Sequence, residues 1–367
     1  VIAGNGLGSG AVVYDLLTDV NLAGTTKVDD LVVGGEISTT SAGTSNTRVG
    51  VNAGNSIASG GNYNVVVGDE AGTAITTGDE NTFVGYATGD AVTTASANTG
   101  VGYNALSQNT SGTQNSAFGN RAGDAITTGD GNTAIGYFSL SSTTTADNNT
   151  AVGVDSLGIN STGADNTGIG KDALRANTTA SNNTAVGSSA LVANTTGSSN
   201  VAVGSAAGDA ITTGNTNVAI GTNAMTTNTV GDRNVAVGHA ALALYIPSSN
   251  EDSYNVAVGY NALYTDTTGK NNTAVGGNAL LLNTTGSSNA AFGTGALDAN
   301  TTGGSNASVG KSSLSANTTG SANAALGADA LASNTTASNN TAVGTNSLNA
   351  NTTGSENVAV GRNALDA

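Results

Sequence analysis

Small and apolar residues return at one short spacing along most of this chain. From Asn46 onward, a five-residue pattern of Asn, any residue, a usually small residue, an apolar residue and Gly occurs 19 times, mostly at a constant interval of seventeen, as its glycines at 187, 204, 221 and 238 show. The alternation within each copy has the period of two that is typical of a β-strand, and the closing Gly predicts a turn. A fixed period of this size without helical spacing indicates a solenoid. We therefore predict an all-β, parallel β-solenoid of about 19–20 seventeen-residue coils.

Two neighbouring copies, NTAVG at 183–187 and NVAVG at 200–204, define the expected role of each position. The asparagines should stack in a ladder, the valines should face the interior, and the glycines should form the corner. The residue four after this Gly is Leu or Met in 14 copies; in the other five it is Gly, and an Ile or Val follows three residues later. One space is thus filled from either of two positions, which places both in a common interior. The residues given these structural roles are Asn183, Val186, Gly187, Leu191, Asn200, Val203, Gly204 and Ile211.

The middle residue of the strand pattern is Ala in 13 copies, Gly in two and Ser in one. Because successive strand residues alternate between faces, this residue should point outward if the valines point inward. A run of small residues suggests a closely approaching neighbour, so we predict that this stripe packs against copies of itself in a homo-oligomer. The alternative is a flat Ala face exposed to solvent.

The repeats also define the domain organisation. Residues 1–45 contain no complete copy and are expected to form an N-terminal adaptor or capping segment, with a possible degenerate coil at 30–45 that contains DLVVG. Residues 46–367 form the repeat domain. The spacing widens by four residues between Gly238 and Gly259, which predicts an inserted loop near 243–254. The chain stops within an unfinished repeat, so we expect it to be a piece of a longer protein.

Composition excludes several classes of function. The net charge is −16 and the nine basic residues are scattered, so we expect no nucleic-acid partner. The chain has no cysteine, which excludes disulfides and thiolate metal sites. It also lacks an apolar run of about 18 residues, so we expect no membrane insertion in this fragment.

Catalytic chemistry has little basis in this sequence. His239 is the single histidine, and it follows a repeat Gly at a position that other copies fill with Ser, Thr, Tyr or Lys. No nucleophile–base set can be assembled around it, and the acidic pairs at 69–70 and 79–80 fall in turns where solubility explains them. We therefore predict that the chain is not an enzyme and needs no cofactor. Calcium is the open alternative, because Asp79 and Asp130 fall in Gly-rich turns.

Four of the nine tyrosines lie close together in the sequence, around the expected insertion. Inserted loops on solenoids project from one face, and aromatic side chains on loops often contact sugars or proteins. The alternative is that these rings pack on the neighbouring coil. The possible receptor contacts are Tyr245, Tyr254, Tyr260 and Tyr264.

With NTAVG and NVAVG recurring in register, the chain resembles the head repeats of trimeric, YadA-like autotransporter adhesins, and also the Gly-, Asn- and Thr-rich repeats of phage fibre proteins. The resemblance covers about residues 46–365. It implies a left-handed β-roll, a homotrimer, and an extracellular fibre or adhesin of a virion or bacterial surface that mediates attachment to a host receptor, either protein or glycan. Two alternatives stay open: an ice-binding solenoid that uses threonine rows such as those of Thr195 and Thr196, and a stalk whose enzymatic or binding tip lies outside this fragment.

Overall fold

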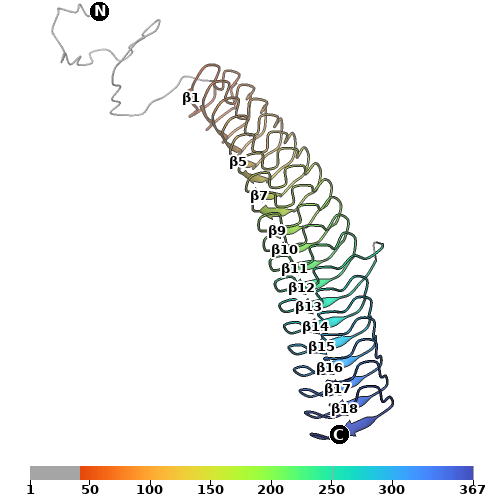
Figure 1. The fold of residues 1–367 in the computed structure, drawn as a ribbon. Helices are drawn as coiled ribbons and strands as arrows, with labels where there is room; N and C mark the ends of the chain where they lie inside the picture. Colours follow the sequence, from red (N-terminus) through yellow and green to blue (C-terminus); the bar gives the residue numbers. More distant parts are fainter. Residues whose placement is uncertain (1–41, 250, 367) are drawn as a thin grey trace, which may run out of the picture. The chain divides into compact units, whose positions relative to one another are not determined.

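The computed structural model describes residues 42–249 and 251–366, and every regular element within them is a β-strand (Figure 1). Each of the 19 strands has three residues, which are the three between the Asn and the Gly of one sequence copy. The strands are β1 (Thr47–Val49), β2 (Val65–Val67), β3 (Thr82–Val84), β4 (Thr99–Val101), β5 (Ser116–Phe118), β6 (Thr133–Ile135), β7 (Thr150–Val152), β8 (Thr167–Ile169), β9 (Thr184–Val186), β10 (Val201–Val203), β11 (Val218–Ile220), β12 (Val235–Val237), β13 (Val256–Val258), β14 (Thr273–Val275), β15 (Ala290–Phe292), β16 (Ala307–Val309), β17 (Ala324–Leu326), β18 (Thr341–Val343) and β19 (Val358–Val360).

Each strand pairs in parallel with the strand of the next coil, so the order along the chain is also the order in the sheet. In the pairing of β9 with β10, Thr184 lies opposite Val201, and Ala185 lies opposite Ala202. The same register holds across the insertion, because Val235 of β12 lies opposite Val256 of β13. The predicted parallel β-solenoid is confirmed, with 19 strands bounding 18 successive coils. The N-terminal segment, and with it DLVVG, lies outside the described residues except for positions 42–45.

The asparagine before each strand forms a continuous buried ladder. The backbone N–H of Asn183 donates to Asn166 Oδ1 at 3.0 Å, while its side-chain Nδ2 donates to Gly197 O at 2.9 Å. Asn200 repeats the arrangement one coil later, with its backbone N–H on Asn183 Oδ1 at 2.9 Å. Because each buried amide both donates and accepts, the ladder joins successive coils without leaving its own polar groups unpaired. The expected role of these asparagines is confirmed.

The facing of the strand residues is opposite to the prediction. Ala185 and Ala202 have no exposed surface, whereas Val203 is 37% exposed and Val186 is half-buried. The cause is the ladder itself: Asn183 points inward, and period-two alternation then turns Ala185 inward and Val186 outward. The small residues therefore line the interior, where they leave room for the second apolar anchor. The prediction that the alanines form an outer contact stripe is wrong.

The exchange between the two apolar anchors is confirmed. Leu191 and Ile211 are both fully buried, although they occupy different positions of the repeat. The backbone at the first position is left-handed in either case, with φ of +50° at Leu191 and +58° at Gly208. A left-handed Leu costs roughly 1–2 kcal/mol, and burying its side chain contributes roughly 1.5–3 kcal/mol. Burial therefore offsets the strain where Leu is present, and Gly avoids it where Ile fills the space.

A second asparagine ladder runs through the interior at the residue seven after the repeat Gly. Asn177 Nδ2 donates to Asn160 Oδ1 at 2.8 Å, and Asn194 Nδ2 donates to Asn177 Oδ1 at 3.0 Å. Ile211 occupies the next place in this ladder, and Asn194 Oδ1 consequently has no hydrogen-bond partner. The second ladder is thus interrupted wherever Gly and Ile replace Leu and Asn.

The longest connection between strands joins β12 to β13, and it extends beyond the outline of the neighbouring coils (Figure 1). Asn255 still donates from its backbone N–H to Asn234 Oδ1 at 3.1 Å, so the first ladder crosses the insertion intact. Ion pairs hold the inserted segment, with Arg233 on Asp252 and Lys270 Nζ 2.7 Å from Glu251 Oε2. The extra residues are therefore accommodated at the surface without changing the stacking of the coils.

Candidate binding surfaces

The four tyrosines around the insertion do not form one cluster. Tyr245 is fully buried, because it lies one regular repeat interval after Asn228 and takes the second-ladder position inside its coil. Tyr254 is 50% exposed, and its hydroxyl donates to Asp252 Oδ2 at 3.0 Å beneath the Arg233 guanidinium. Tyr260 is 59% exposed, and Tyr264 is half-buried. The prediction of a surface contact at Tyr245 is corrected, and the other three rings remain accessible.

His239 and Tyr260 lie one coil apart in the same row, directly after the repeat Gly. Their rings stack with centroids 5.4 Å apart and an angle of 16° between the ring planes. Tyr86 and Tyr103 form an equivalent stack in the same row nearer the N-terminus, also at 5.4 Å. The in-register stacking of coils therefore converts a sequence row into a continuous aromatic surface wherever adjacent copies carry rings.

A surface hollow of about 410 Å³ adjoins the His239–Tyr260 pair, and we call it the aromatic groove. Its floor is the coil that carries Ala240 and Ala243, both nearly fully buried. The equivalent residues of the two neighbouring coils are larger. At the position of Ala240 both neighbouring coils have Asn, and at the position of Ala243 they have Thr226 and Tyr264. Two small residues of the middle coil thus lie between larger side chains of the coils on either side, at the place where the hollow is found. Its lining is Asn223, Thr226, His239, Ala240, Ala243, Leu244, Tyr260, Asn261 and Tyr264.

The third residue of every strand forms a row on the outer face of the sheet, which we call the outer apolar row. All its members are Val, Ile, Phe or Leu, and each is exposed or half-buried, with Leu326 at 51% exposure. The sequence analysis missed this surface because it assigned the valines to the interior. The row comprises Val49, Val67, Val84, Val101, Phe118, Ile135, Val152, Ile169, Val186, Val203, Ile220, Val237, Val258, Val275, Phe292, Val309, Leu326, Val343 and Val360.

One acidic side chain stands inside the solenoid. Asp266 takes the second-ladder position after Tyr245, and its Oδ1 accepts hydrogen bonds from Gly269 N and Asn283 Nδ2, both at 3.0 Å. Its Oδ2 is buried without a hydrogen-bond partner. Burial raises the pKa of Asp266 to about 7, and burial likewise raises the pKa of Tyr245 to about 12. A carboxyl group thus replaces an amide in a place built for an amide.

The two candidate calcium ligands have structural partners. Asp79 Oδ1 accepts from the backbone N–H of Asn62 at 2.6 Å, and Asp130 Oδ1 accepts from Thr113 N at 2.6 Å and Thr113 Oγ1 at 2.9 Å. Ser96 has the same role in its coil, where its hydroxyl accepts from Asp79 N at 3.0 Å. These carboxylates therefore link neighbouring coils. Residues 42–249 and 251–366 contain no group of three or more His, Cys, Asp or Glu side chains placed to hold a metal ion.

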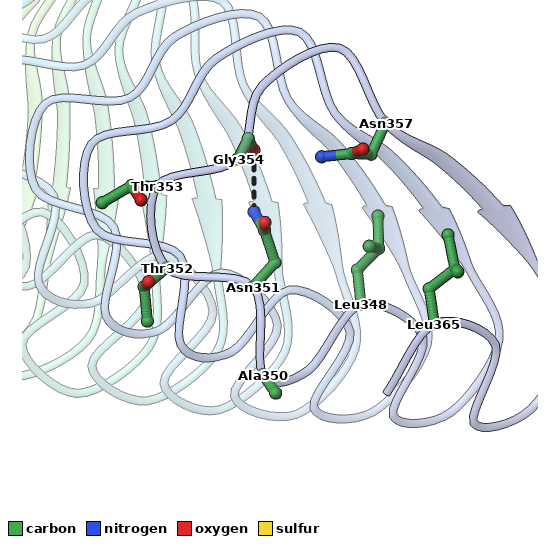
Figure 2. A pocket seen from close by; sticks show the side chains of 8 residues that line it. All are labelled: Leu348, Ala350, Asn351, Thr352, Thr353, Gly354, Asn357 and Leu365. Atoms are coloured by element: carbon green, nitrogen blue, oxygen red, sulfur yellow. Dashed lines mark hydrogen bonds between the residues drawn. The ribbon is translucent and has the colours of Figure 1, made fainter. Parts of the chain in front are cut away.

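A second hollow lies at the last coil (Figure 2). Leu348 and Leu365 extend side by side from successive coils, and Asn351 Nδ2 donates to Gly354 O at 2.9 Å. These are the interior positions that the following coil covers elsewhere in the stack, as Leu331 is covered one coil earlier. The hollow is the uncovered face of a coil and contains no residue that other coils lack.

No family model matches this chain, and neither a curated protein nor a solved structure matches it. Within the described part of the chain, no helix is long and apolar enough to cross a membrane. The fold defines the chain as a parallel β-solenoid, and its surfaces provide the basis for a proposed function.

Proposed function

We propose that this chain is the shaft of a homotrimeric fibre or adhesin, on a virion or a bacterial surface, that mediates or displays attachment to a host. The observation that carries the proposal is the outer apolar row, which runs the length of the described sheet. Monomeric soluble proteins rarely expose continuous apolar patches beyond a few hundred Å². A regular shaft with an apolar face and little internal charge is better suited to assembly and display than to catalysis.

Further copies of the same chain are the proposed occupants of the outer apolar row. The row repeats at the spacing of the coils, so a second copy in register offers the same spacing of apolar side chains. The first residue of each strand lies beside this row and is mostly Thr or Val, as at Thr184 and Val201, which adds β-branched surface to the same face. This argument replaces the one based on the alanines. The trimer and the left-handed β-roll are what the resemblance to autotransporter heads implies.

Solution mass tests the assembly. Sedimentation equilibrium should give three times the 35.2 kDa chain mass for the wild type. The double substitution Val203→Asp/Ile220→Asp places charge on the outer apolar row and should shift the mass toward the monomer while circular dichroism stays unchanged. Thr196→Asp, at an exposed site off the sheet, is the matched control and should remain trimeric. A monomeric wild type would overturn the assembly.

Attachment is tested separately. Fluorescent beads coated with the chain should be retained on at least one member of a panel of bacterial and eukaryotic cells, and beads coated with albumin should not. Retention on no member of the panel would contradict an attachment role for these coils, and would favour the alternative in which the shaft carries an enzymatic or binding tip outside this fragment.

Ice binding is the second candidate, and one observation favours it. The threonine nine residues after the repeat Gly forms an exposed row that includes three of the five Gly-type coils and is interrupted between Thr196 and Thr268. The preceding threonine is less available, because the Thr195 hydroxyl donates to Thr212 O at 3.0 Å and its neighbours do the same. A single row of threonines with exposed side chains matches the surface lattice of ice less well than two parallel rows would. A gap between melting and freezing temperatures would support ice binding, and its absence would remove it. The exposed row is Thr77, Thr94, Thr128, Thr145, Thr162, Thr179, Thr196, Thr268, Thr285, Thr302, Thr319, Thr336 and Thr353.

A further inference from the structure

Aromatic rings border the aromatic groove along two rows of the repeat. His239 and Tyr260 belong to the row after the repeat Gly, and Tyr264 belongs to the row four residues later. Amide groups of Asn223 and Asn261 line the same hollow. Flat apolar surfaces and hydrogen-bonding groups are thus presented together over three successive coils.

His239 is the one histidine in the lining of the aromatic groove, and the other lining residues are Asn, Thr, Ala, Leu and Tyr. The lining contains no Asp, Glu, Lys or Arg, although the chain as a whole has a net charge of −16. An anionic ligand would meet no lysine or arginine there, and a cationic ligand would meet no carboxylate. The groove volume of about 410 Å³ lies within the range of roughly 300–1,000 Å³ that small-molecule sites occupy. The groove is therefore suited to a neutral ligand of small-molecule size.

We propose that the aromatic groove binds a neutral sugar residue of a surface glycan; this inference rests on the attachment role proposed above and names its ligand class. A pyranose ring has an apolar C–H face that packs on Tyr260 or Tyr264, and hydroxyl groups around its edge that pair with the Asn223 and Asn261 amides. The alanine floor provides the depth that the ring needs. Because the sites on three copies are displayed together, weak individual binding is multiplied by avidity.

Two variants test the groove by different means. Tyr264→Ala removes an aromatic wall. Ala240→Phe fills the floor while keeping every proposed sugar contact, and the repeat already accepts Phe at this position, since Phe138 has φ of +56° and Ala240 has φ of +51°. Tyr103→Ala is the control, because it removes an exposed ring from an equivalent stacked pair outside the groove. Urea unfolding and sedimentation establish that each variant retains its fold and assembly.

The probe is an array of oligosaccharides that end in glucose, galactose, mannose or N-acetylglucosamine, beside sialylated and sulfated ones, followed by calorimetric titration of the best binder. We expect the wild type to bind a neutral member, Tyr264→Ala and Ala240→Phe to weaken binding about tenfold or more, and Tyr103→Ala to change it less than about twofold. Binding of only charged glycans, equal losses in all variants, or no binding up to about 10 mM sugar would overturn the inference.

The outcome is separable from that of the proposed function. If bead retention on cells persists in Tyr264→Ala and Ala240→Phe, the groove is not the attachment site, while the attachment role stands. If the wild type binds a neutral sugar but is monomeric and is retained on no cell, the groove inference stands and the proposed fibre role fails.

Discussion

Leu191 and Ile211 fill equivalent interior space from two different positions of the repeat. A Cβ atom added to Gly208 would lie 3.2 Å from Leu191 Cδ2 and 3.0 Å from Ile211 Cδ1. Gly208 therefore lacks a side chain because Ile211 already fills the place that a Leu at position 208 would take. This relationship also decides the polar interior, because Ile211 stands where an asparagine would otherwise continue the second ladder from Asn194.

Converting this coil from one type to the other requires both changes together. Gly208→Leu alone should destabilise the chain by about 1–3 kcal/mol through overpacking, and Ile211→Asn alone by about 2–5 kcal/mol through a cavity and a buried amide. The double variant should recover most of the loss, because the introduced leucine would fill the space and the introduced asparagine would donate to Asn194 Oδ1. The measurement is the midpoint of urea unfolding for the four members of the cycle. Additive losses would contradict a shared space.

The exchange between Leu191 and Ile211 was predictable because it depends on side-chain volume alone. The residue types at the two positions, Leu or Gly at the first and Asn or Ile at the second, show directly which of them fills the space. The facing of Ala185 and Val186 was not predicted, although the information was present. A three-residue strand has two possible phases, and only the asparagine before it distinguishes them: Asn183 must bury its amide in the ladder, and this turns Ala185 inward. Reasoning from the valines alone selected the wrong phase.

The candidate surfaces differ in how far the sequence could have predicted them. Tyr245 lies one regular repeat interval after Asn228, and the four extra residues come after it, so its interior position was readable from the spacing. The aromatic groove depends instead on side chains from three coils. Ala240 and Ala243 have smaller side chains than the equivalent residues of the two neighbouring coils. Such a hollow emerges only when the rows of the repeat are placed side by side in space.

Phe83 shows how the interior accommodates a large residue at the small position. It is fully buried, and a Cβ at Gly100 would lie 3.0 Å from its Cδ1 and 2.7 Å from Thr88 Cγ2. We expect Gly100→Ala to destabilise by about 1–3 kcal/mol, although Ala is the usual residue there, and Phe83→Ala to cost about 3–5 kcal/mol. In the Phe83→Ala background, Gly100→Ala should cost less, because of these two contacts only the one with Thr88 Cγ2 remains. The midpoints of urea unfolding test this prediction. An equal loss of stability from Gly100→Ala in both backgrounds would show that Phe83 does not determine the cost of a side chain at position 100.

Asp266 should make stability depend on pH. Burial raises its pKa from 3.8 to about 7 in the folded chain, so the folded state holds this proton more tightly than the unfolded state. The stabilisation of the folded state by this protonated carboxyl group is fully present below pH 4 and is lost as the pH rises through about 7. In Asp266→Asn, an amide would donate to Gly269 O as Asn283 donates to Gly286 O at 2.9 Å. We expect this variant to be more stable than the wild type by roughly 1–3 kcal/mol at pH 8.

The measurement for Asp266 is the urea midpoint between pH 4 and pH 8. The difference between Asp266→Asn and the wild type should widen over this range. Asp165→Asn, which removes an exposed acid, is the control and should show no such widening. A constant difference between Asp266→Asn and the wild type would show that the buried carboxyl does not titrate in this range.

Removal of divalent cations should leave the thermal stability unchanged. Asp79 and Asp130 bind backbone N–H groups of the preceding coil, and Ser96 serves in the same position, so these carboxylates have a structural role without a metal. We expect the midpoint of thermal unfolding in excess EDTA to equal that in millimolar calcium. A higher midpoint in calcium that is lost in Asp130→Asn would instead establish a calcium site at that turn.

The corner glycines should be far less replaceable than glycines elsewhere on the surface. Gly204 has φ of +133°, and an added Cβ would lie 2.7 Å from Gly221 C and 2.8 Å from Gly221 O in the next coil. Gly277 lies one residue after an equivalent corner, and an added Cβ there meets nothing within 4 Å. We expect Gly204→Ala to cost at least about 2 kcal/mol, and Gly277→Ala to change stability by less than about 0.5 kcal/mol. Hydrogen exchange gives the local readout, since Gly204→Ala should speed exchange in β10 and β11 most. Equal effects of the two substitutions would show that close stacking at the corner does not require glycine.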